Sequence, residues 1–304
     1  MKSSSKQPIS LNEVGVLLLG YNRPTLLRNR LTELAAQGVK NLYISIDGGV
    51  SSKTLEMENA KKFAVNKFSH IDRFQLDHNK KNLGVDLHTY KKVTEILKFH
   101  EYIIVIEDDI QLSKNFIVNL LNGLSILKMN NKPGVVSSWS PLSCKRLNNR
   151  WRLSSYSFTW GWACSREVWK DFHLDLNGEN IFSNMGNSMK WKNFSDLQKK
   201  QWESKFRNVR NYKWIPWDIQ FFNYGLKNDL VFLAPIYTFS GNEGFGSSKS
   251  THTNGSKPFI LSIAKLNNGK VVGISKFVYK ACHFLDKYYM NDLKIIQRLK
   301  SKDL

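Results

Sequence analysis

Cysteine is scarce in this 304-residue chain, and long apolar runs are missing. The three cysteines, Cys144, Cys164 and Cys282, lie far apart and match no zinc or disulfide spacing, so we expect core or free thiols. No run approaches the ~20 apolar residues of a membrane-spanning helix. Residues 1–10 are rich in Ser and Lys and are not followed by the apolar core of a signal peptide. These absences favour a cytoplasmic protein.

Acidic residues are also few, because 25 Asp and Glu stand against 45 Lys and Arg, a formal net charge of +20. Such a charge favours an anionic partner, and nucleic acid, membrane phospholipid and phosphorylated substrates all qualify. The basic residues are spread along the chain without a zinc-finger or RNP-like pattern, so we do not expect nucleic acid as the partner. The hydrophobic share of 41% is sufficient for a large core.

The first half of the chain alternates between strand-like and helix-like segments. Short β-branched or leucine-rich runs predict strands, and apolar residues three and four apart predict helices. Thr25 is expected to cap the first helix. The predicted strands are 14–19, 41–46, 73–77 and 103–106, and the predicted helices are 26–37, 53–68 and 88–99. This order predicts an α/β fold with a mainly parallel sheet, right-handed connections and helices on both faces.

The second half of the chain is less regular and richer in aromatic residues. We expect a helix over 115–129, strands over 135–140 and 229–235, a polar and mostly helical stretch over 179–210, and a flexible Gly/Ser-rich loop over 240–254.

Three consecutive acids, Glu107, Asp108 and Asp109, follow the predicted strand 103–106. Adjacent carboxylates repel one another unless a positive charge lies among them, and a divalent cation with oxygen ligands is the obvious candidate. In open α/β sheets the ligand crevice lies outside the carboxyl ends of the strands, where these acids fall. The alternative is a solvated turn in which Asp109 or Ser113 caps the next helix.

Other segments add polar and aromatic groups that suit a nucleotide-sugar site. Asp47 ends the second predicted strand, where it can accept hydrogen bonds from a base or ribose; the alternative is a turn former before two glycines. The segment 82–84 lies at the same sheet edge, and Gly84 permits close approach of the backbone. The stretch 156–163 places aromatic rings around a glycine; such rings pack against sugars, with core packing as the alternative.

Together these motifs resemble GT-A glycosyltransferases, and in particular a bacterial group of nucleotide-diphospho-sugar transferases. The chain is also similar, more distantly, to the eukaryotic N-acetylglucosaminyltransferase that initiates complex N-glycans. The resemblance covers residues 12–255 and rests on Asn-Leu-Gly at 82–84, Glu-Asp-Asp at 107–109, Trp-Gly-Trp-Ala at 160–163 with Val-Trp at 168–169, Trp-Asp-Ile-Gln at 217–220, and Asn-Glu-Gly-Phe-Gly at 242–246 with Thr-His-Thr at 251–253.

The resemblance implies a role for each matching residue. Asp109 would bind Mn²⁺ or Mg²⁺, and His252 would be a further contact to the metal or the pyrophosphate, with a surface histidine as the alternative. Asp218 would be the general base, with a helix N-cap as the alternative. The implied donor-nucleotide residues are Gly20, Tyr21, Asn22, Arg23, Asp47, Asn82, Gly84, Glu107 and Asp108, and the implied sugar and acceptor residues are Trp160, Gly161, Trp162 and Trp217.

The implied enzyme is an inverting, metal-dependent glycosyltransferase with a Rossmann-like GT-A domain over 12–255. Residues 12–130 would form the nucleotide-binding half, and 131–255 the acceptor half with a closing loop. The donor would be a nucleotide-diphosphate sugar, with a UDP-sugar expected, and the acceptor a glycan or lipid-linked molecule in the synthesis of lipopolysaccharide or capsule. The alternatives are a sugar-1-phosphate nucleotidyltransferase and a non-catalytic relative. The former should carry a Gly-rich basic loop after the first strand, where residues 20–24 have a single glycine and a proline.

Two parts of the sequence depart from this pattern. Related sequences often carry Lys or Arg between Gly84 and His88, where this chain has Val-Asp-Leu, so we expect Lys91 or Arg23 to supply the basic contact to the diphosphate. The tail 256–304 carries ten Lys or Arg and three Asp, with apolar residues near helical spacing. It predicts a basic amphipathic helix that either packs on its own domain or holds the protein at an anionic inner membrane surface.

Overall fold

The computed structural model describes residues 7–140, 151–175, 188–196, 198–200, 202–203 and 216–244. The predicted metal contact His252 and the tail 256–304 lie outside these residues.

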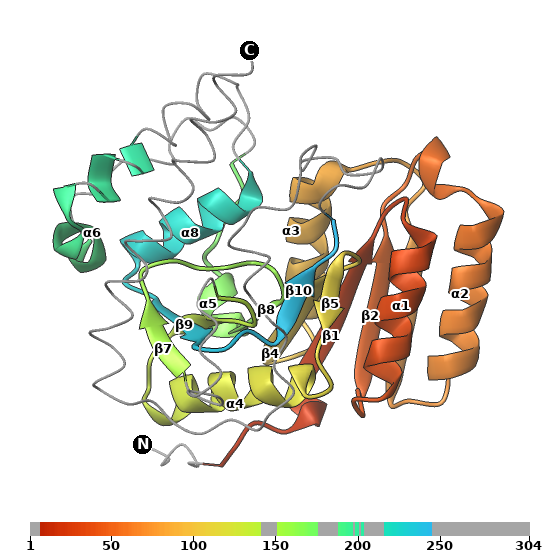
Figure 1. Ribbon diagram of the computed structural model, residues 1–304, viewed down its shortest axis with the longest axis horizontal. Coiled ribbons are helices and arrows are strands. Elements are labelled where there is room, and N and C mark those ends of the chain that lie inside the picture. The colour runs from red at the N-terminus through yellow and green to blue at the C-terminus, as the bar shows by residue number, and fades with distance from the viewer. Residues whose placement is uncertain are drawn as a thin grey trace.

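An eight-stranded mixed sheet forms the centre of the molecule (Figure 1). Its strand order is β3-β2-β1-β4-β8-β6-β9-β7, and the first four of these run parallel to one another. The strands are β1 (Val14–Gly20), β2 (Asn41–Ile46), β3 (Arg73–His78), β4 (Tyr102–Glu107), β6 (Gly134–Ser137), β7 (Trp151–Ser154), β8 (Trp162–Ser165) and β9 (Val231–Pro235). The predicted α/β fold with a mainly parallel sheet is confirmed.

Helices cover both faces of this sheet because successive side chains of each strand point to opposite sides. The helices are α1 (Pro24–Ala35), α2 (Leu55–Phe68), α3 (Gly84–Ile96), α4 (Phe116–Met129), α5 (Arg166–Trp169), α6 (Met189–Asn193) and α8 (Trp217–Lys227), with single 3-10 turns at Leu11–Glu13 and Val50–Ser52. On β1, Val16 and Leu18 pack into one core with α1, α2 and α4, while Leu17 and Leu19 pack into the other with α3, α5 and α8.

A second, two-stranded sheet lies directly after the acids. β5 (Ile110–Leu112) pairs antiparallel with β10 (Ser240–Asn242), and Figure 1 shows the two side by side. The predicted flexible loop over 240–254 is therefore wrong at its start, where Ser240 is buried in a strand. This pairing brings a late segment of the chain against the turn that carries the acids.

Three other expectations about helix ends are corrected. α1 begins at Pro24 with Arg23 as its N-cap residue, so Thr25 does not cap it; proline at the first position presets the helical φ. α3 begins at Gly84, four residues before its predicted start. Asn115 is the N-cap of α4, so neither Asp109 nor Ser113 has that function. Within the described part of the chain, no helix is long and apolar enough to span a membrane.

Candidate active site at the carboxyl ends of the parallel strands

A cavity of about 310 Å³ opens where β1, β2 and β4 end. This is the place that parallel α/β sheets offer to ligands, because the loops after adjacent strands meet there. All nine predicted donor-nucleotide residues line it. The lining consists of Leu19, Gly20, Tyr21, Asn22, Arg23, Asp47, Asn82, Gly84, Val85, Asp86, His88, Thr89, Glu107 and Asp108.

Asp47 shapes one wall of the cavity by accepting hydrogen bonds from its neighbours. Its carboxylate accepts from the backbone N–H groups of Gly48 (2.9 Å), Leu83 (3.0 and 3.2 Å) and Gly84 (3.0 Å), and from Asn79 Nδ2 (3.2 Å). The side chain is buried and satisfies two of the N–H groups that the start of α3 leaves free. In this structure Asp47 therefore organises the 82–84 loop. The Asn82 amide donates to the Tyr21 hydroxyl at 3.1 Å and accepts from the backbone N–H of Gly84 at 2.7 Å.

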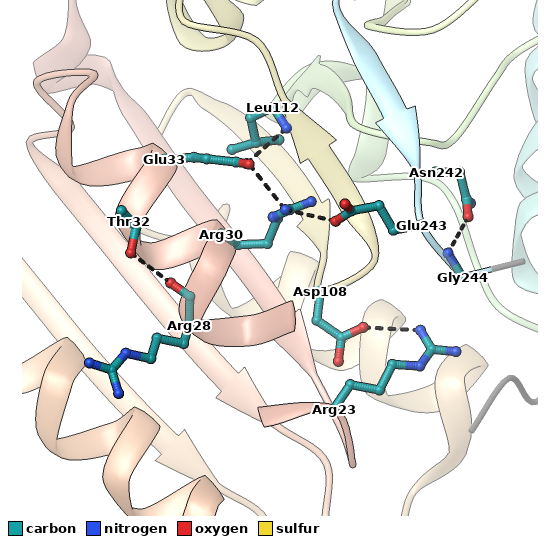
Figure 2. A network of polar contacts seen from close by, with 10 residues as sticks. All are labelled: Arg23, Arg28, Arg30, Thr32, Glu33, Asp108, Leu112, Asn242, Glu243 and Gly244. Carbon is teal, nitrogen blue, oxygen red and sulfur yellow. Dashed lines mark hydrogen bonds and ion pairs between the residues drawn. The ribbon is translucent and has the colours of Figure 1, made fainter. Parts of the chain in front are cut away.

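Arg23 lies between the two aspartates of the acidic turn. Its Nη1 is 3.1 Å from Asp108 Oδ1 and 2.8 Å from Asp109 Oδ2, and Figure 2 shows the guanidinium facing Asp108. Asp108 Oδ2 also accepts a hydrogen bond from the backbone N–H of Tyr21 at 3.3 Å. These ion pairs therefore link the loop after β1 to the end of β4.

One guanidinium does not compensate three adjacent acids. Burial, followed by the charges of Asp109, Asp108 and Asp218, raises the pKa of Glu107 well above its ordinary value, while Arg23 opposes the shift. Burial and the charge of Asp109 likewise raise the pKa of Asp108 to about 7, against Arg23 and the Tyr21 N–H. A further cation at this place would relieve both effects.

The donor set of this turn fits a divalent cation. Carboxylate oxygens are the ligands that Mn²⁺ and Mg²⁺ prefer, and Asp109 Oδ1 is buried with no hydrogen-bond partner among the described residues. No three Asp, Glu, His or Cys side chains of the described residues converge as a complete metal cluster. The remaining positions suit phosphate oxygens and water, as in sites that bind a metal together with a phosphorylated substrate.

Gly244 closes the acidic turn from the side of β10. A Cβ built on Gly244 would lie 2.3 Å from Asp109 Oδ2, so a side chain there would displace the Asp109 carboxylate. The backbone N–H of Glu243 donates to the carbonyl oxygen of Asp109 at 2.8 Å. The predicted Asn242–Gly246 motif therefore begins in direct contact with the predicted metal ligand.

Asp218 lies outside the cavity lining, in the first turn of α8. Its charge contributes to the raised pKa of Glu107, so the structure brings the predicted base close to the acidic turn. Asp86, whose side chain is also buried, accepts a hydrogen bond from the backbone N–H of Trp217 at 2.8 Å. α8 has no side-chain cap of its own, and Asp86 supplies that hydrogen bond from α3.

Two of the four predicted sugar and acceptor residues lie in the core. Trp162 and Trp217 are 1% and 4% exposed and pack on each other with a centroid distance of 5.5 Å, so the structure favours core packing for both. Gly161 has a φ of +75°, and a Cβ there would lie 2.6 Å from Ser138 Oγ. Trp160 is only partly buried and remains the predicted aromatic surface for a sugar.

Sequence reasoning missed several residues of this region. Arg30 is 1% exposed, and its Nη2 contacts Glu33 Oε1 at 3.0 Å and Glu243 Oε2 at 2.9 Å, as Figure 2 shows. Glu33 Oε2 in turn accepts from the backbone N–H of Leu112 at 2.9 Å. The available signal was an arginine on the buried stripe of a helix, between Leu27 and Leu34. This network fixes α1 against the two-stranded sheet beside the acids.

His88 and Asp86 were missed as well, although both line the cavity. His88 Nε2 is 2.7 Å from Ser45 Oγ, and burial, with Lys92 adding and Asp47 opposing, lowers the pKa of His88. Residues two apart do not share a helix face, so their spacing gave no signal for a common site. The predicted helix start at 88 also left Asp86 outside the helix.

No family model matches the chain, and no curated protein matches it. Among solved structures, the chain is similar to a mannosyltransferase from Pyrobaculum calidifontis, solved with GDP-Man and Mn²⁺, at 16% identity and a TM-score of 0.38. The match covers 52% of this chain and 46% of the mannosyltransferase, so it spans less than half of that enzyme.

Two further solved structures are similar. One is the 4-diphosphocytidyl-2C-methyl-D-erythritol synthase of Anaerococcus prevotii, at 10% identity and a TM-score of 0.34, covering 54% of this chain and 78% of that one. The other is a Bacillus anthracis protein described as a putative glucose-1-phosphate thymidylyltransferase, at 9% identity and a TM-score of 0.37, covering 84% of this chain and 98% of that one. All three scores lie below 0.5, so the class of this chain rests on its own strand order and site. That class is a Rossmann-like α/β protein with an acidic, arginine-bridged cavity at its strand ends.

Proposed function

We propose that the chain is an inverting, metal-dependent glycosyltransferase of GT-A type that uses a nucleotide-diphosphate sugar. One observation carries the proposal: the nine residues expected to bind the donor nucleotide, drawn from four separate segments, line one cavity beside the acidic turn. Loops after adjacent parallel strands meet in any such sheet, so the support comes from the groups they bring together, with Arg23 between Asp108 and Asp109 beside the cavity. The expected donor is a UDP-sugar, and the transferase domain extends over residues 12–255.

Donor binding would use both polar walls of the cavity. The loop 20–23 and the segment 82–84, which Asp47 holds in place, would enclose the nucleoside. Arg23 supplies positive charge next to Asp108 and Asp109, where the diphosphate would lie. Asp109 would hold Mn²⁺ or Mg²⁺, and Asp108 would contact the ribose or a metal-bound water. The metal, when bound, neutralises the diphosphate as leaving group.

Asp218 would act as the general base on the acceptor. It would take the proton from the acceptor hydroxyl as the hydroxyl oxygen attacks the anomeric carbon, in a single displacement that inverts the anomeric configuration. Its place at the start of α8, held by the Asp86 hydrogen bond to Trp217, gives the carboxylate a fixed position.

The acceptor would be a glycan or a lipid-linked intermediate of surface polysaccharide synthesis, with Trp160 as an aromatic contact. The net charge of +20 and the basic extension 256–304 favour work at the anionic inner face of the cell membrane.

Calorimetric titration tests this proposal before any acceptor is known. UDP, GDP, dTDP and CDP are titrated into the full chain with and without Mn²⁺, and then into Asp109→Asn. One nucleotide should bind in a Mn²⁺-dependent manner, and Asp109→Asn should lose roughly tenfold or more in affinity, about 1.4 kcal/mol. Asp72→Asn is the matched control, because Asp72 is exposed and distant from the cavity lining. A folded protein that binds none of the four nucleotides would contradict the proposal.

A further inference from the structure

Arg23 has an unusual position for an N-cap residue. It is the N-cap of α1, but its side chain makes no capping bond, and Pro24 follows at the first helical position. The guanidinium instead extends to Asp108 and Asp109, which follow Arg23 by 85 and 86 residues. Its side chain is 14% exposed, and it lines the same cavity as the predicted nucleotide residues. The guanidinium therefore contacts the acidic turn beside the cavity and does not cap α1.

The pairing of Arg23 with the two aspartates is incomplete. One nitrogen, Nη1, serves both carboxylates, whereas the strongest arginine pairs use two nitrogens on one carboxylate. Within the described residues, Arg23 Nε and Asp109 Oδ1 are buried without a hydrogen-bond partner. Buried donors and acceptors without partners are costly. The pairing of Arg23 with the aspartates leaves one buried donor and one buried acceptor without a partner. An arrangement that pairs both groups would be lower in free energy.

We propose that Arg23 competes with a divalent cation for the acidic turn and serves the donor once the cation binds. Nη1 contacts both Asp108 and Asp109. When a divalent cation binds at Asp109, the guanidinium turns to the diphosphate in the adjoining cavity, since arginine matches phosphate geometry with two nitrogens. Arg23 is thus a competitor of the metal and a ligand of the donor. This inference rests on the proposed function and adds the source of the basic contact to the diphosphate.

Arg28 offers a matched control. It lies five residues further on, in α1, and its guanidinium packs over the Phe63 ring at 4.9 Å. Figure 2 shows Arg28 directed away from Asp108. Arg28→Met therefore removes the same charge from the same helix without touching the acids.

The experiment measures Mn²⁺ binding alone and then UDP binding at saturating Mn²⁺, in the full chain and in Arg23→Met, Arg23→Gln and Arg28→Met. Both Arg23 variants should bind Mn²⁺ more tightly than the unaltered chain, by roughly threefold to tenfold, because the competing cation is gone. The same variants should bind UDP at least roughly tenfold more weakly, because the phosphate ligand is gone. Arg28→Met should match the unaltered chain in both titrations. Thermal unfolding identifies the folded variants, and Arg23→Gln keeps a hydrogen-bond donor if Arg23→Met does not fold.

The exchange predicts that the Arg23 variants gain affinity for Mn²⁺ and lose affinity for UDP. Arg23 variants that lose affinity for both Mn²⁺ and UDP, or that leave Mn²⁺ affinity unchanged, would overturn the exchange and leave Arg23 as a fixed structural partner, while the proposed function stands. An unaltered chain that binds neither Mn²⁺ nor any nucleotide would overturn the proposed function together with the exchange.

Discussion

Single residues hold the walls of the candidate site together. Asp47 accepts hydrogen bonds from three backbone N–H groups and from the Asn79 amide, so one carboxylate orders the loops after β2 and β3. Arg23 links the loop after β1 to the end of β4. Each of these side chains was identifiable in the sequence as polar and near a strand end, but the number of bonds it makes was not.

Gly161 gives a prediction at the same scale. Its φ of +75° disfavours any side chain, and an added Cβ would lie 2.6 Å from Ser138 Oγ and 2.9 Å from Phe116. Gly161→Ala should lower the free energy of unfolding by about 3 kcal/mol, from backbone strain and overpacking together. Gly38→Ala is the control for strain alone, because Gly38 has a φ of +65° with nothing within 4 Å of its Cβ position, and should cost about 1 kcal/mol. Equal losses in urea unfolding would show that the contact is unimportant.

At the scale of elements, the link between α3 and α8 positions the candidate base. Asp86 caps the first turn of α8 through the Trp217 N–H. Asp86→Ala should lower the free energy of unfolding by about 1–2 kcal/mol, as other lost N-caps do, and Asp86→Asn by less, because its amide oxygen still accepts. Urea unfolding of both variants measures the difference. Equal losses would mean that the carboxylate charge, and not the hydrogen bond, carries the effect.

Lys190 on α6 gives a pH-dependent prediction. It donates to the carbonyl oxygen of Leu230 and lies 4.0 Å over the Phe232 ring, and burial lowers its pKa from 10.5 to about 8 while Asp229 opposes the shift. Between these two values the unfolded chain binds more protons than the folded one, so this group makes stability rise with pH from about 8 upward.

Lys190→Met should remove that rise. Between pH 7.5 and 9.5 the unaltered chain should gain about 1–2 kcal/mol of unfolding free energy relative to the variant. Urea unfolding at the two pH values measures the gain. The other Lys and Tyr residues are the same in both chains, so their contributions to the pH dependence of stability cancel in the difference. Parallel pH profiles would show that Lys190 titrates normally.

At the scale of the whole molecule, the sequence predicted the parallel half of the fold well. Buried runs such as 41–46 and 103–106 have strand length and β-branched composition, and the helices between them show clear periodicity. β7 and β8 were not predicted, because they lie in an aromatic stretch without alternation. Pairings such as Arg30 with Glu243 or Asp86 with Trp217 join residues more than 100 positions apart, and no local pattern encodes them.

The basic extension gives a prediction for the whole chain. A chain that ends at Lys257 should keep the nucleotide affinity of the full chain and lose binding to vesicles that contain phosphatidylglycerol, because nine basic residues are removed with the tail. Vesicle sedimentation at low and physiological salt measures the difference. Equal sedimentation of both chains would contradict a role of the extension at membranes.

We propose that the cavity at the strand ends holds a nucleotide diphosphate next to Asp109, and a crystal structure of the full chain with Mn²⁺ and the tightest-binding nucleotide tests this. We expect the nucleoside between residues 20–23 and 82–84, and the diphosphate beside Asp109 with the Arg23 guanidinium turned toward it. A nucleotide bound elsewhere on the chain, with Arg23 still on Asp108 and Asp109, would contradict it.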